Sequence, residues 1–367
     1  MKLVGGLVLL MVFVSNIEAA GEVDPARIDA IFADLKSNTA PGAAVLVIKA
    51  GRAVFSRGYG VTDLRSFARI DVHTNFRLAS VSKQVTATAV MLLVHDGKLR
   101  YDERLTDIFR DFPAYGRAIK IRHLLNHTSG LRDYEDLMSA DNGASPEKIP
   151  QIKDAEVLAL LKQQTTTKFV PGTKWAYSNS GYAGLAMVVE KVSRKAFGQF
   201  LQERIFGPLK MQNTIAYERG KNEVPHRAYG HTRKEAGWRE TDQSPTSAVL
   251  GDGGIYSSLD DLAKWDEALR HHNLLSEVEM RPALTPAKLP AGGGAGFRDK
   301  RAEYGFGWFL DFYNGHARMW HFGETVGFRT AIQRFVDDKL TIIVLCNRED
   351  VSAQALSLKV ADLYLPR

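Results

Sequence analysis

Hydrophobic and polar positions alternate with two different periods along the chain, and this separates its ends from its middle. Residues 43–62 (AAVLVIKAGRAVFSRGYGVT) contain two β-rich runs on either side of KAGR, a pattern typical of a β-hairpin. Similar runs return late in the chain as GFGWFLDF, ARMWHFG, FRTAIQRFV and LTIIVLCN. From residue 81 to about 215 the patterns are mainly helical, and 216–250 is polar and irregular. Strands at both ends around a helical middle predict an α/β protein with a helical insertion.

Three helices are marked by their ends as well as by their apolar positions. SVSKQVTATAVMLLVHDG begins with two serines and stops at Gly97. SSLDDLAKWDEALRHH predicts a second helix, with its own Ser258 as a favoured type of cap. SAQALSLKVADLYL predicts a final helix that closes the chain. We place the α/β part at about 22–80 and 250–367, and the helical part at about 81–249.

The N-terminal segment predicts export. A single Lys precedes an apolar run from Leu3 to Val14, and the small residues Ala19, Ala20 and Gly21 follow. This order is typical of a secretory signal peptide, and the run is too short to span a membrane comfortably. We therefore expect residues 1–21 to be a signal peptide and the protein to be secreted or periplasmic. The competing interpretation is an uncleaved N-terminal anchor, which is also the one way in which we expect membrane contact.

Composition and charge mainly narrow the classes of partner and cofactor that we expect. The chain of 367 residues is 45% hydrophobic and 25% charged, with a net charge of +6. Its Lys and Arg residues are scattered, and no nucleic-acid-binding signature lies between them, so we expect a small-molecule or peptide partner and no nucleic acid. The one cysteine, Cys346, cannot form an internal disulfide, and its place in a strand-like run predicts burial. We expect no cofactor and no metal.

The first candidate chemistry lies in FRLASVSK. Ser80 and Lys83 are separated by three positions, so on a helix they share a face. A serine hydroxyl is a weak nucleophile until a neighbouring base takes its proton, and a lysine amine can act as that base. The first turn of a helix also leaves backbone N–H groups available for an oxyanion. Ser82 lies beside Lys83 in sequence and faces elsewhere. The alternative is a helix start with a serine cap and no chemistry.

Two further motifs carry polar groups suited to acyl transfer. In WAYSNSGY, Tyr177 offers a phenol and Asn179 an amide just before a helix. In MWHFGETVGF, His321 and Gly323 form a His-x-Gly element, and the N–H of Glu324 is a candidate second oxyanion donor. Each motif also has a structural interpretation: a packed tyrosine, a capping asparagine and a buried or surface histidine.

In this order, Ser80-x-x-Lys83, Tyr177-x-Asn179 and His321-x-Gly323 resemble the three motifs of the penicillin-recognising serine hydrolases. The pattern is most similar to the class C β-lactamase-like branch, which includes D-aminopeptidases, D,D-carboxypeptidases and carboxylesterases. The stretches IRHLLNHTSGL and GDGGIYSSLDDLAKW resemble the same branch. The resemblance covers about residues 25–365.

The resemblance implies an antiparallel sheet flanked by helices plus an all-helical subdomain, with the site between them. It implies that Ser80 is the acylated nucleophile, Lys83 its base and Tyr177 a proton-transfer partner. It also implies that Asn179, His321, Gly323 and Glu324 bind substrate. The predicted activity is hydrolysis of an ester, amide, D-peptide or β-lactam carbonyl through an acyl-enzyme. His321 stands where many β-lactamases have a lysine, which favours ester or D-peptide substrates over efficient β-lactam hydrolysis.

Three rival interpretations remain. A Ser-His-Asp hydrolase would need Gly-x-Ser-x-Gly, and the sequence lacks that pentapeptide. His123 and His127 have the i, i+4 spacing of a metal pair without the glutamate of the zinc-protease motif. A catalytically inactive homologue that binds peptidoglycan or another envelope component would keep the fold, although the nucleophile and lysine are both present.

Overall fold

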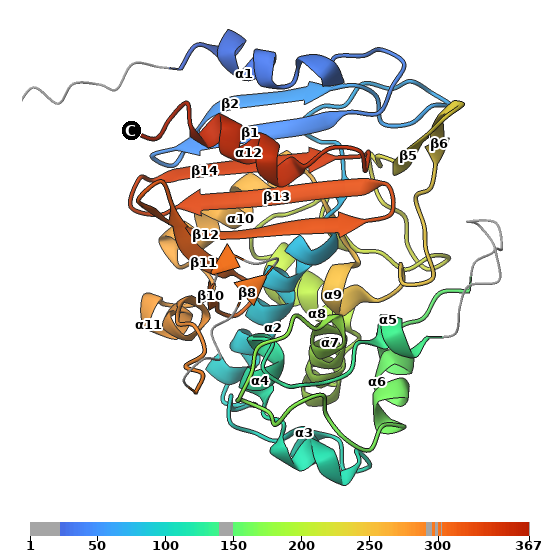
Figure 1. Ribbon diagram of the computed structural model, residues 1–367, viewed down its shortest axis with the longest axis vertical. Helices are drawn as coiled ribbons and strands as arrows, with labels where there is room; N and C mark the ends of the chain where they lie inside the picture. The colour runs from blue at the N-terminus through green and yellow to red at the C-terminus, as the bar shows by residue number, and fades with distance from the viewer. Residues whose placement is uncertain (1–22, 139–149, 291–295, 298–299, 302, 367) are drawn as a thin grey trace, which may run out of the picture.

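A seven-stranded antiparallel sheet forms one layer of the molecule and a group of helices forms the other (Figure 1). The computed structural model describes residues 23–138, 150–290, 296–297, 300–301 and 303–366. The predicted signal peptide, residues 1–21, lies outside this range. The sheet order is β10-β11-β12-β13-β14-β1-β2. The strands are β1 (Ala43–Lys49), β2 (Arg52–Tyr59), β10 (Glu303–Tyr304), β11 (Phe309–Tyr313), β12 (His316–Thr325), β13 (Phe328–Phe335) and β14 (Leu340–Cys346).

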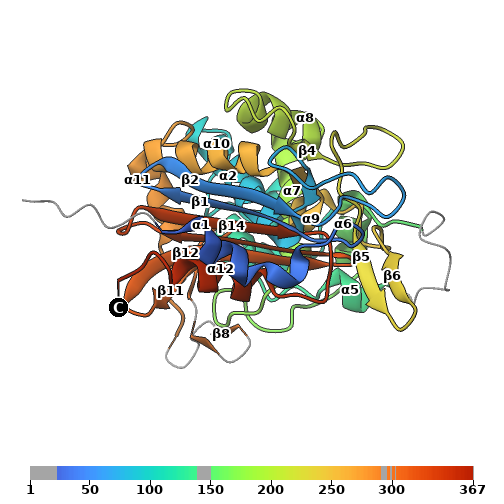
Figure 2. The same ribbon diagram turned by 90° about the horizontal axis from the view of Figure 1, so that it is seen from above.

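The predicted hairpin is confirmed: β1 pairs with β2, and on its other side β1 pairs with β14 along its whole length. Helices cover both faces of the pair β1 and β14. Figure 2 shows α1 (Pro25–Ile31) and α12 (Ala353–Ala361) on one side and α10 (Leu259–His271) on the other. Residues Ala43, Val45 and Val47 accordingly face one core, and the alternate residues of β1 face the other. Burial on both faces explains the continuous apolar runs of these strands.

Helix α2 (Lys83–His95) is the central helix of the second layer and is buried almost all round. It contacts α7 (Asn179–Ser193), which also packs on α4, α6 and α9. The other helices of this layer are α3 (Leu105–Ile108), α4 (Ile121–Leu125), α5 (Tyr134–Leu137), α6 (Asp154–Lys162), α8 (Phe197–Leu201) and α9 (Leu250–Gly253). The remaining helical pieces are the 3₁₀ turns η1 (Ala33–Leu35), η2 (Ala79–Ser82), η3 (Ala114–Ala118) and η5 (Arg281–Leu284), the π turn η4 (Gln202–Phe206) and α11 (Glu277–Met280).

Three small sheets accompany the main sheet among the described residues, and one of them corrects the expectation of an irregular 216–250 segment. Within that segment β5 (His231–Lys234) and β6 (Gly237–Glu240) form an antiparallel hairpin. Its residues are polar or half-exposed, so no apolar alternation marks it in the sequence. The other small sheets join β3 (Phe76–Arg77), β7 (Ile255–Ser257) and β4 (Ile215–Ala216), and β8 (Gly296–Phe297) and β9 (Lys300–Arg301). The predicted cap of α10 is confirmed, since the Ser258 side chain accepts from the Asp261 N–H.

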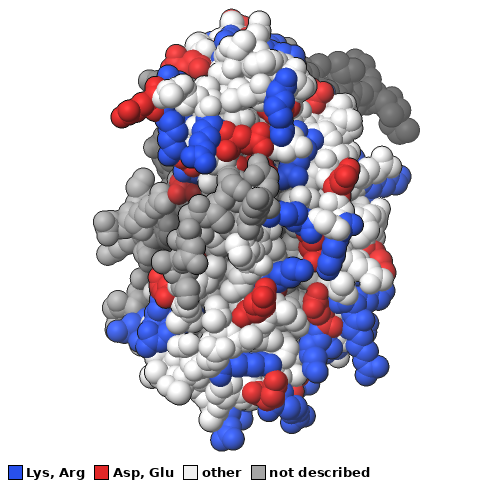
Figure 3. All heavy atoms as spheres, turned by 90° about the vertical axis from the view of Figure 1, so that its right-hand side faces the viewer, with Lys and Arg blue, Asp and Glu red and all other residues white. Residues whose placement is uncertain are grey.

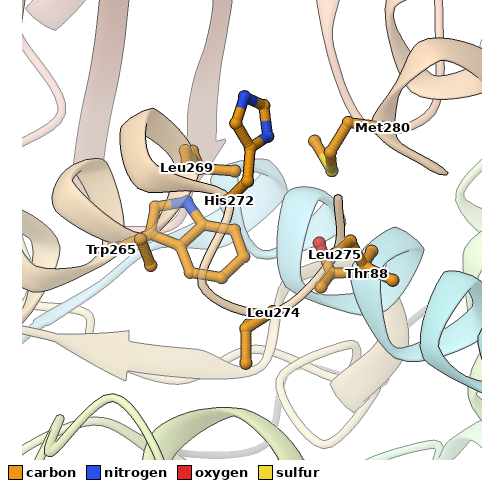
Figure 4. A pocket seen from close by; sticks show the side chains of 8 residues that line it. Thr88, Trp265, Leu269, His272, Leu274, Leu275 and Met280 are labelled. Carbon is orange, nitrogen blue, oxygen red and sulfur yellow. The ribbon is translucent and has the colours of Figure 1, made fainter. Parts of the chain in front are cut away.

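On the face seen in Figure 3, Lys and Arg are interspersed with Asp and Glu. Within the described ranges, every helix is too short or too polar to cross a membrane. A small apolar hollow of about 10 Å³ lies where α10 meets α2, beside Trp265 and Thr88 (Figure 4). It has room for about one water molecule, so we regard it as a packing defect of the core.

Candidate active site

Ser80 lies in the 3₁₀ turn η2, one turn before α2 begins at Lys83. The residue before it, Ala79, has a φ of +48°, a left-handed conformation that non-glycine residues rarely adopt. Neighbouring contacts hold this turn: Leu78 N–H donates to the Ile255 carbonyl at 2.9 Å, and Thr330 Oγ1 donates to the Leu78 carbonyl at 2.7 Å. Strain of this kind persists only where the surroundings fix it, and it gathers at functional sites.

Lys83 is completely buried and its amine meets three oxygen atoms. Its Nζ lies 3.0 Å from Ser80 Oγ. The same atom donates to Asn179 Oδ1 at 2.9 Å and to the Asp252 carbonyl at 2.9 Å. An amide oxygen and a backbone carbonyl can only accept, whereas a serine hydroxyl can also donate. A neutral Lys83 amine would therefore donate its two hydrogens to those two acceptors, and its lone pair would face the Ser80 hydroxyl.

Asn179 is the first residue of α7, and its position is fixed from three sides. Ser178 caps the helix by accepting from the Gly181 N–H at 3.1 Å. The Asn179 backbone N–H donates to Asp133 Oδ2 at 2.8 Å, and its amide nitrogen donates to Glu135 Oε1 at 3.4 Å. With its Oδ1 held by Lys83, the side chain of Asn179 orients the lysine. Its predicted contact with substrate stays a prediction.

The ring of Tyr177 lies over the amine of Lys83, with 5.0 Å between Nζ and the ring centroid. His127 packs against the other rings nearby: its centroid is 4.3 Å from that of Tyr177 and 4.4 Å from that of Tyr304. Nδ1 of the fully buried His127 accepts from the Ser178 N–H at 3.2 Å. His127 therefore supports the loop that carries Tyr177, a role that its spacing from His123 did not reveal.

His321 is 1% exposed, and both of its ring nitrogens are used inside the protein. Its Nε2 lies 3.0 Å from the Tyr304 hydroxyl and its Nδ1 lies 2.7 Å from the Phe322 carbonyl. Burial, with the charge of Lys83 adding to it, lowers the pKa of His321 to about 3, so the ring is neutral at pH 7. In this arrangement His321 faces Tyr177 from the sheet and does not line the cleft at Ser80.

Gly323 brings β12 against the turn that carries Ser80. A Cβ at this position would lie 2.2 Å from the Leu78 carbonyl oxygen and 2.4 Å from Thr330 Oγ1, so only glycine fits. The next two residues, Glu324 and Thr325, line the cleft. The strand edge thus lies against the turn that carries Ser80, and the oxyanion role of the Glu324 N–H stays a prediction.

Ser80 opens onto a polar cleft of about 50 Å³. Two acidic residues of the cleft have shifted pKa values: burial raises the pKa of Glu135 to about 7 and that of Asp252 to about 6. Asp252 Oδ2 accepts from the Tyr134 hydroxyl at 2.8 Å. The lining residues come from both layers: Arg77, Ala79, Ser80, Tyr134, Glu135, Asn179, Thr246, Asp252, Gly253, Glu324 and Thr325.

The chain matches the family model described as Beta-lactamase over residues 28–364. The chain belongs to the Beta-lactamase family. It is 31% identical over 334 residues to penicillin-binding protein 4* of Bacillus subtilis, which covers 88% of this chain and 71% of that protein. It is 29% identical over 333 residues to a D-aminopeptidase of Brucella canis, which covers 89% of this chain and 60% of that protein.

A solved relative shows the same architecture. The D-amino acid amidase of Ochrobactrum anthropi SV3, complexed with L-phenylalanine amide, superposes with a TM-score of 0.76 at 23% identity, over 92% of this chain and 96% of that one. At this identity the likeness shows the fold alone. It confirms the predicted antiparallel sheet with helices, and the family match confirms the resemblance drawn from the motifs.

In this family member, three charged residues of the cleft were not among the predicted site residues. Asp252 lies in GDGG and Arg77 in FRLASVSK, so both belong to stretches that carried the resemblance, but no spacing rule pointed to their side chains. Glu135 follows the HTSG turn and lies in the four-residue helix α5, which is too short to show a period in the sequence. The rival metal pair gains no support, since the described ranges contain no group of three or more potential ligands placed to hold an ion.

Proposed function

We propose that the protein is a serine hydrolase that forms an acyl-enzyme on Ser80. The observation that carries this proposal is the contact of Lys83 Nζ with Ser80 Oγ at 3.0 Å, beside two partners that can only accept hydrogens. This arrangement turns the lone pair of a deprotonated amine to the hydroxyl that must lose its proton.

In the proposed reaction, Ser80 Oγ attacks the substrate carbonyl while its proton passes to Lys83. The backbone N–H groups of Ser80 and Glu324 bind the oxyanion of the tetrahedral intermediate. The C–O or C–N bond to the leaving group then breaks, and the leaving group takes a proton through Tyr177 and Lys83. Water attacks the ester on Ser80 in the second half, delivers its proton along the same route, and releases the acid and free Ser80.

The proposed substrate is an ester or a peptide or amide of a D-amino acid, in preference to a β-lactam. A fixed cation at position 321 would help to bind a β-lactam carboxylate, and the buried His321 is neutral near pH 7 because its pKa is lowered to about 3. The names of two relatives agree with this choice, because one is a D-aminopeptidase and the other a D-amino acid amidase. We also propose that the protein acts outside the cytoplasm, on the evidence of residues 1–21.

A substrate panel tests this proposal. Wild-type protein and the Ser80→Ala variant would be assayed with a short-chain p-nitrophenyl ester, a D-Ala-D-Ala peptide and a chromogenic cephalosporin. We expect wild type to hydrolyse the ester or the peptide faster than the cephalosporin, and we expect Ser80→Ala to lose the activity while unfolding at the same temperature. Folded wild-type protein that hydrolyses none of the three would overturn the proposal in favour of a binding homologue.

A further inference from the structure

Asp154 is a buried carboxyl group that caps a helix other than its own. It is the first residue of α6 and is 7% exposed. Its Oδ2 accepts from the Leu250 N–H at 2.8 Å, and its Oδ1 accepts from the Gly251 N–H at 3.0 Å. These are the first two N–H groups of α9, and N–H groups at a helix start have no partner within their own helix. Asp154 therefore caps α9 with both of its oxygen atoms.

The chain around Asp154 leaves its side chain available for this contact. The start of α6 is capped by Glu156, whose Oε2 accepts from the Lys153 N–H at 2.9 Å. Lys153 also forms a parallel β-bridge with Ala248, two residues before α9 begins. The segments that lead into α6 and α9 thus run side by side, which brings Asp154 to the start of α9.

Helix α9 carries the backbone atoms that hold α2 at Lys83. The Asp252 carbonyl accepts from Lys83 Nζ at 2.9 Å. One residue earlier, the Gly251 carbonyl accepts from Thr86 Oγ1 at 2.7 Å. Gly251 is therefore held at its N–H by Asp154 and at its carbonyl by Thr86. These two contacts fix the turn whose next carbonyl, that of Asp252, orients the lysine amine.

A carboxylate at this position is costly, and its second oxygen explains why it is present. Burial raises the pKa of Asp154 to about 7, and the charge of Asp252 adds to this rise. An asparagine would avoid the buried charge, but its amide offers one oxygen where two N–H groups need acceptors. The carboxylate accepts from both, and hydrogen bonds to a charged acceptor are the stronger kind.

We propose that Asp154 is a positioning residue for the attack of Ser80. By fixing the first turn of α9 it holds the Asp252 carbonyl in place, and that carbonyl directs the Lys83 amine to the serine hydroxyl. Among the described residues, the cleft wall includes Asp252 but not Asp154, so Asp154 acts through α9. This inference rests on the proposed function for the role of Lys83.

The experiment measures how reactive Ser80 is, independently of turnover. The rate constant for labelling of Ser80 by a fluorophosphonate probe would be compared between wild type and Asp154→Asn at pH 8, where most of Asp154 is ionised. We expect labelling to slow by about tenfold, because small displacements of reacting groups cost rate on this scale. With substrate, kcat should fall by a similar factor and KM should stay within a few-fold.

Thr86→Val removes the second contact of the same turn without changing any charge. We expect it also to slow labelling several-fold, which separates the position of α9 from the charge of Asp154. In the double variant the loss should be smaller than the product of the single losses, since both changes loosen one turn. Thr86→Val also tests the proposal if Asp154→Asn does not fold.

Asp261→Asn is the matched control for lost stability. Asp261 is completely buried in α10, and its Oδ2 accepts from the Asn213 N–H at 2.8 Å and from the Thr214 hydroxyl at 2.9 Å. We expect this variant to unfold at a lower temperature, as Asp154→Asn should, but to be labelled within a few-fold of the wild-type rate.

Three results would overturn the proposal. The first is wild-type labelling in Asp154→Asn, and the second is equal slowing in Asp154→Asn and Asp261→Asn, which indicates a structural role. The third is slow labelling in Asp154→Asn with a wild-type rate in Thr86→Val, which indicates an effect of charge alone. The expected order of labelling rates, in a protein that hydrolyses no substrate, would overturn the proposed function alone.

Discussion

Two walls meet at Ser80, and their chemistry differs. The helical wall, built by η2, α2, α7 and α9, holds the Lys83 amine among oxygen acceptors, with Glu135 and Asp252 nearby. The strand wall, built by β12, presents the neutral His321 within a cluster of aromatic rings that includes Tyr304. In the proposed mechanism, the proton-transfer groups Ser80 and Lys83 therefore lie on the helical wall, while the strand wall contributes backbone and packing.

The pKa shifts on the two walls have opposite signs. Burial raises the pKa values of Glu135 and Asp252, so folding shifts these carboxyl groups towards their neutral form. Burial lowers the pKa of His321, which is therefore neutral at pH 7. At the same pH a pKa of about 6 leaves Asp252 mostly ionised and a pKa of about 7 leaves Glu135 about half ionised, so the titrating charge near Lys83 lies on the helical wall.

Removing the Lys83 amine from the helical wall should lower activity more than any other change considered for the two walls. We expect Lys83→Met to lower kcat by about 10³-fold, because general-base catalysis contributes on this scale. Steady-state assays on the best substrate of the panel measure the loss.

Ser82→Ala is the matched control one position away, because the Ser82 Oγ accepts from the Ile255 N–H at 3.3 Å. It should lose about 1 kcal/mol of stability and keep kcat within a few-fold. The reverse ranking of the two variants would contradict the assignment.

Tyr177 joins the two walls, and its hydroxyl should matter less than the lysine. We expect Tyr177→Phe to lower kcat by about 10²-fold with little change in KM, since the ring stacking with His127 and Phe309 is kept. A pH–rate profile and the thermal unfolding temperature complete the measurement. Unchanged kcat in a stable variant would show that Tyr177 only packs.

A substitution at Gly323 tests whether β12 packs so closely on the turn of Leu78 that only glycine is tolerated there. We expect Gly323→Ala to destabilise the protein by about 2 kcal/mol, because its Cβ would meet the Leu78 carbonyl and overpacking has costs of this size. Denaturant unfolding measures the change. Gly315→Ala is the control, since a Cβ there would meet nothing within 4 Å, although the positive φ of Gly315 carries a smaller strain of its own. Equal losses in the two variants would contradict the close fit.

At neutral pH, substitution of His321 should have the smallest effect on stability, and its effect should grow in acid. Its pKa is about 3 in the folded protein and about 6.5 when unfolded, so between these values the unfolded state binds more protons. Stability should therefore fall as the pH drops below about 6.5, by up to about 1.4 kcal/mol per pH unit from this residue. His321→Gln should flatten that limb and leave stability above pH 7 without a new slope. An unchanged acid limb, followed by denaturant unfolding at a series of pH values, would contradict the burial of a neutral ring.

Much of the fold was predictable because local patterns carry it. The apolar runs of β1 and β14 follow from burial on both faces, and the run after Lys83 gives the central helix α2. The β5–β6 hairpin was missed because its polar residues show no alternation. In the site, the i, i+3 spacing of Ser80 and Lys83 led directly to their contact, which arises within one turn of the chain.

The remaining site residues could not be placed from sequence because they meet across long chain separations. The Asp252 carbonyl reaches Lys83 across 169 positions, and the Asn179 amide across 96. Whether His321 faces substrate or the protein interior depends on Tyr304, which lies on a short edge strand with little periodicity.

The most direct test of the account is covalent labelling of Ser80. A fluorophosphonate probe loses fluoride to an activated serine and leaves a stable adduct whose position peptide mass spectrometry reports. We predict one adduct, on Ser80, in the wild-type protein, and none in Ser80→Ala or, at short times, in Lys83→Met. An adduct on Ser82, or a folded wild-type protein that stays unlabelled, would contradict the central claim.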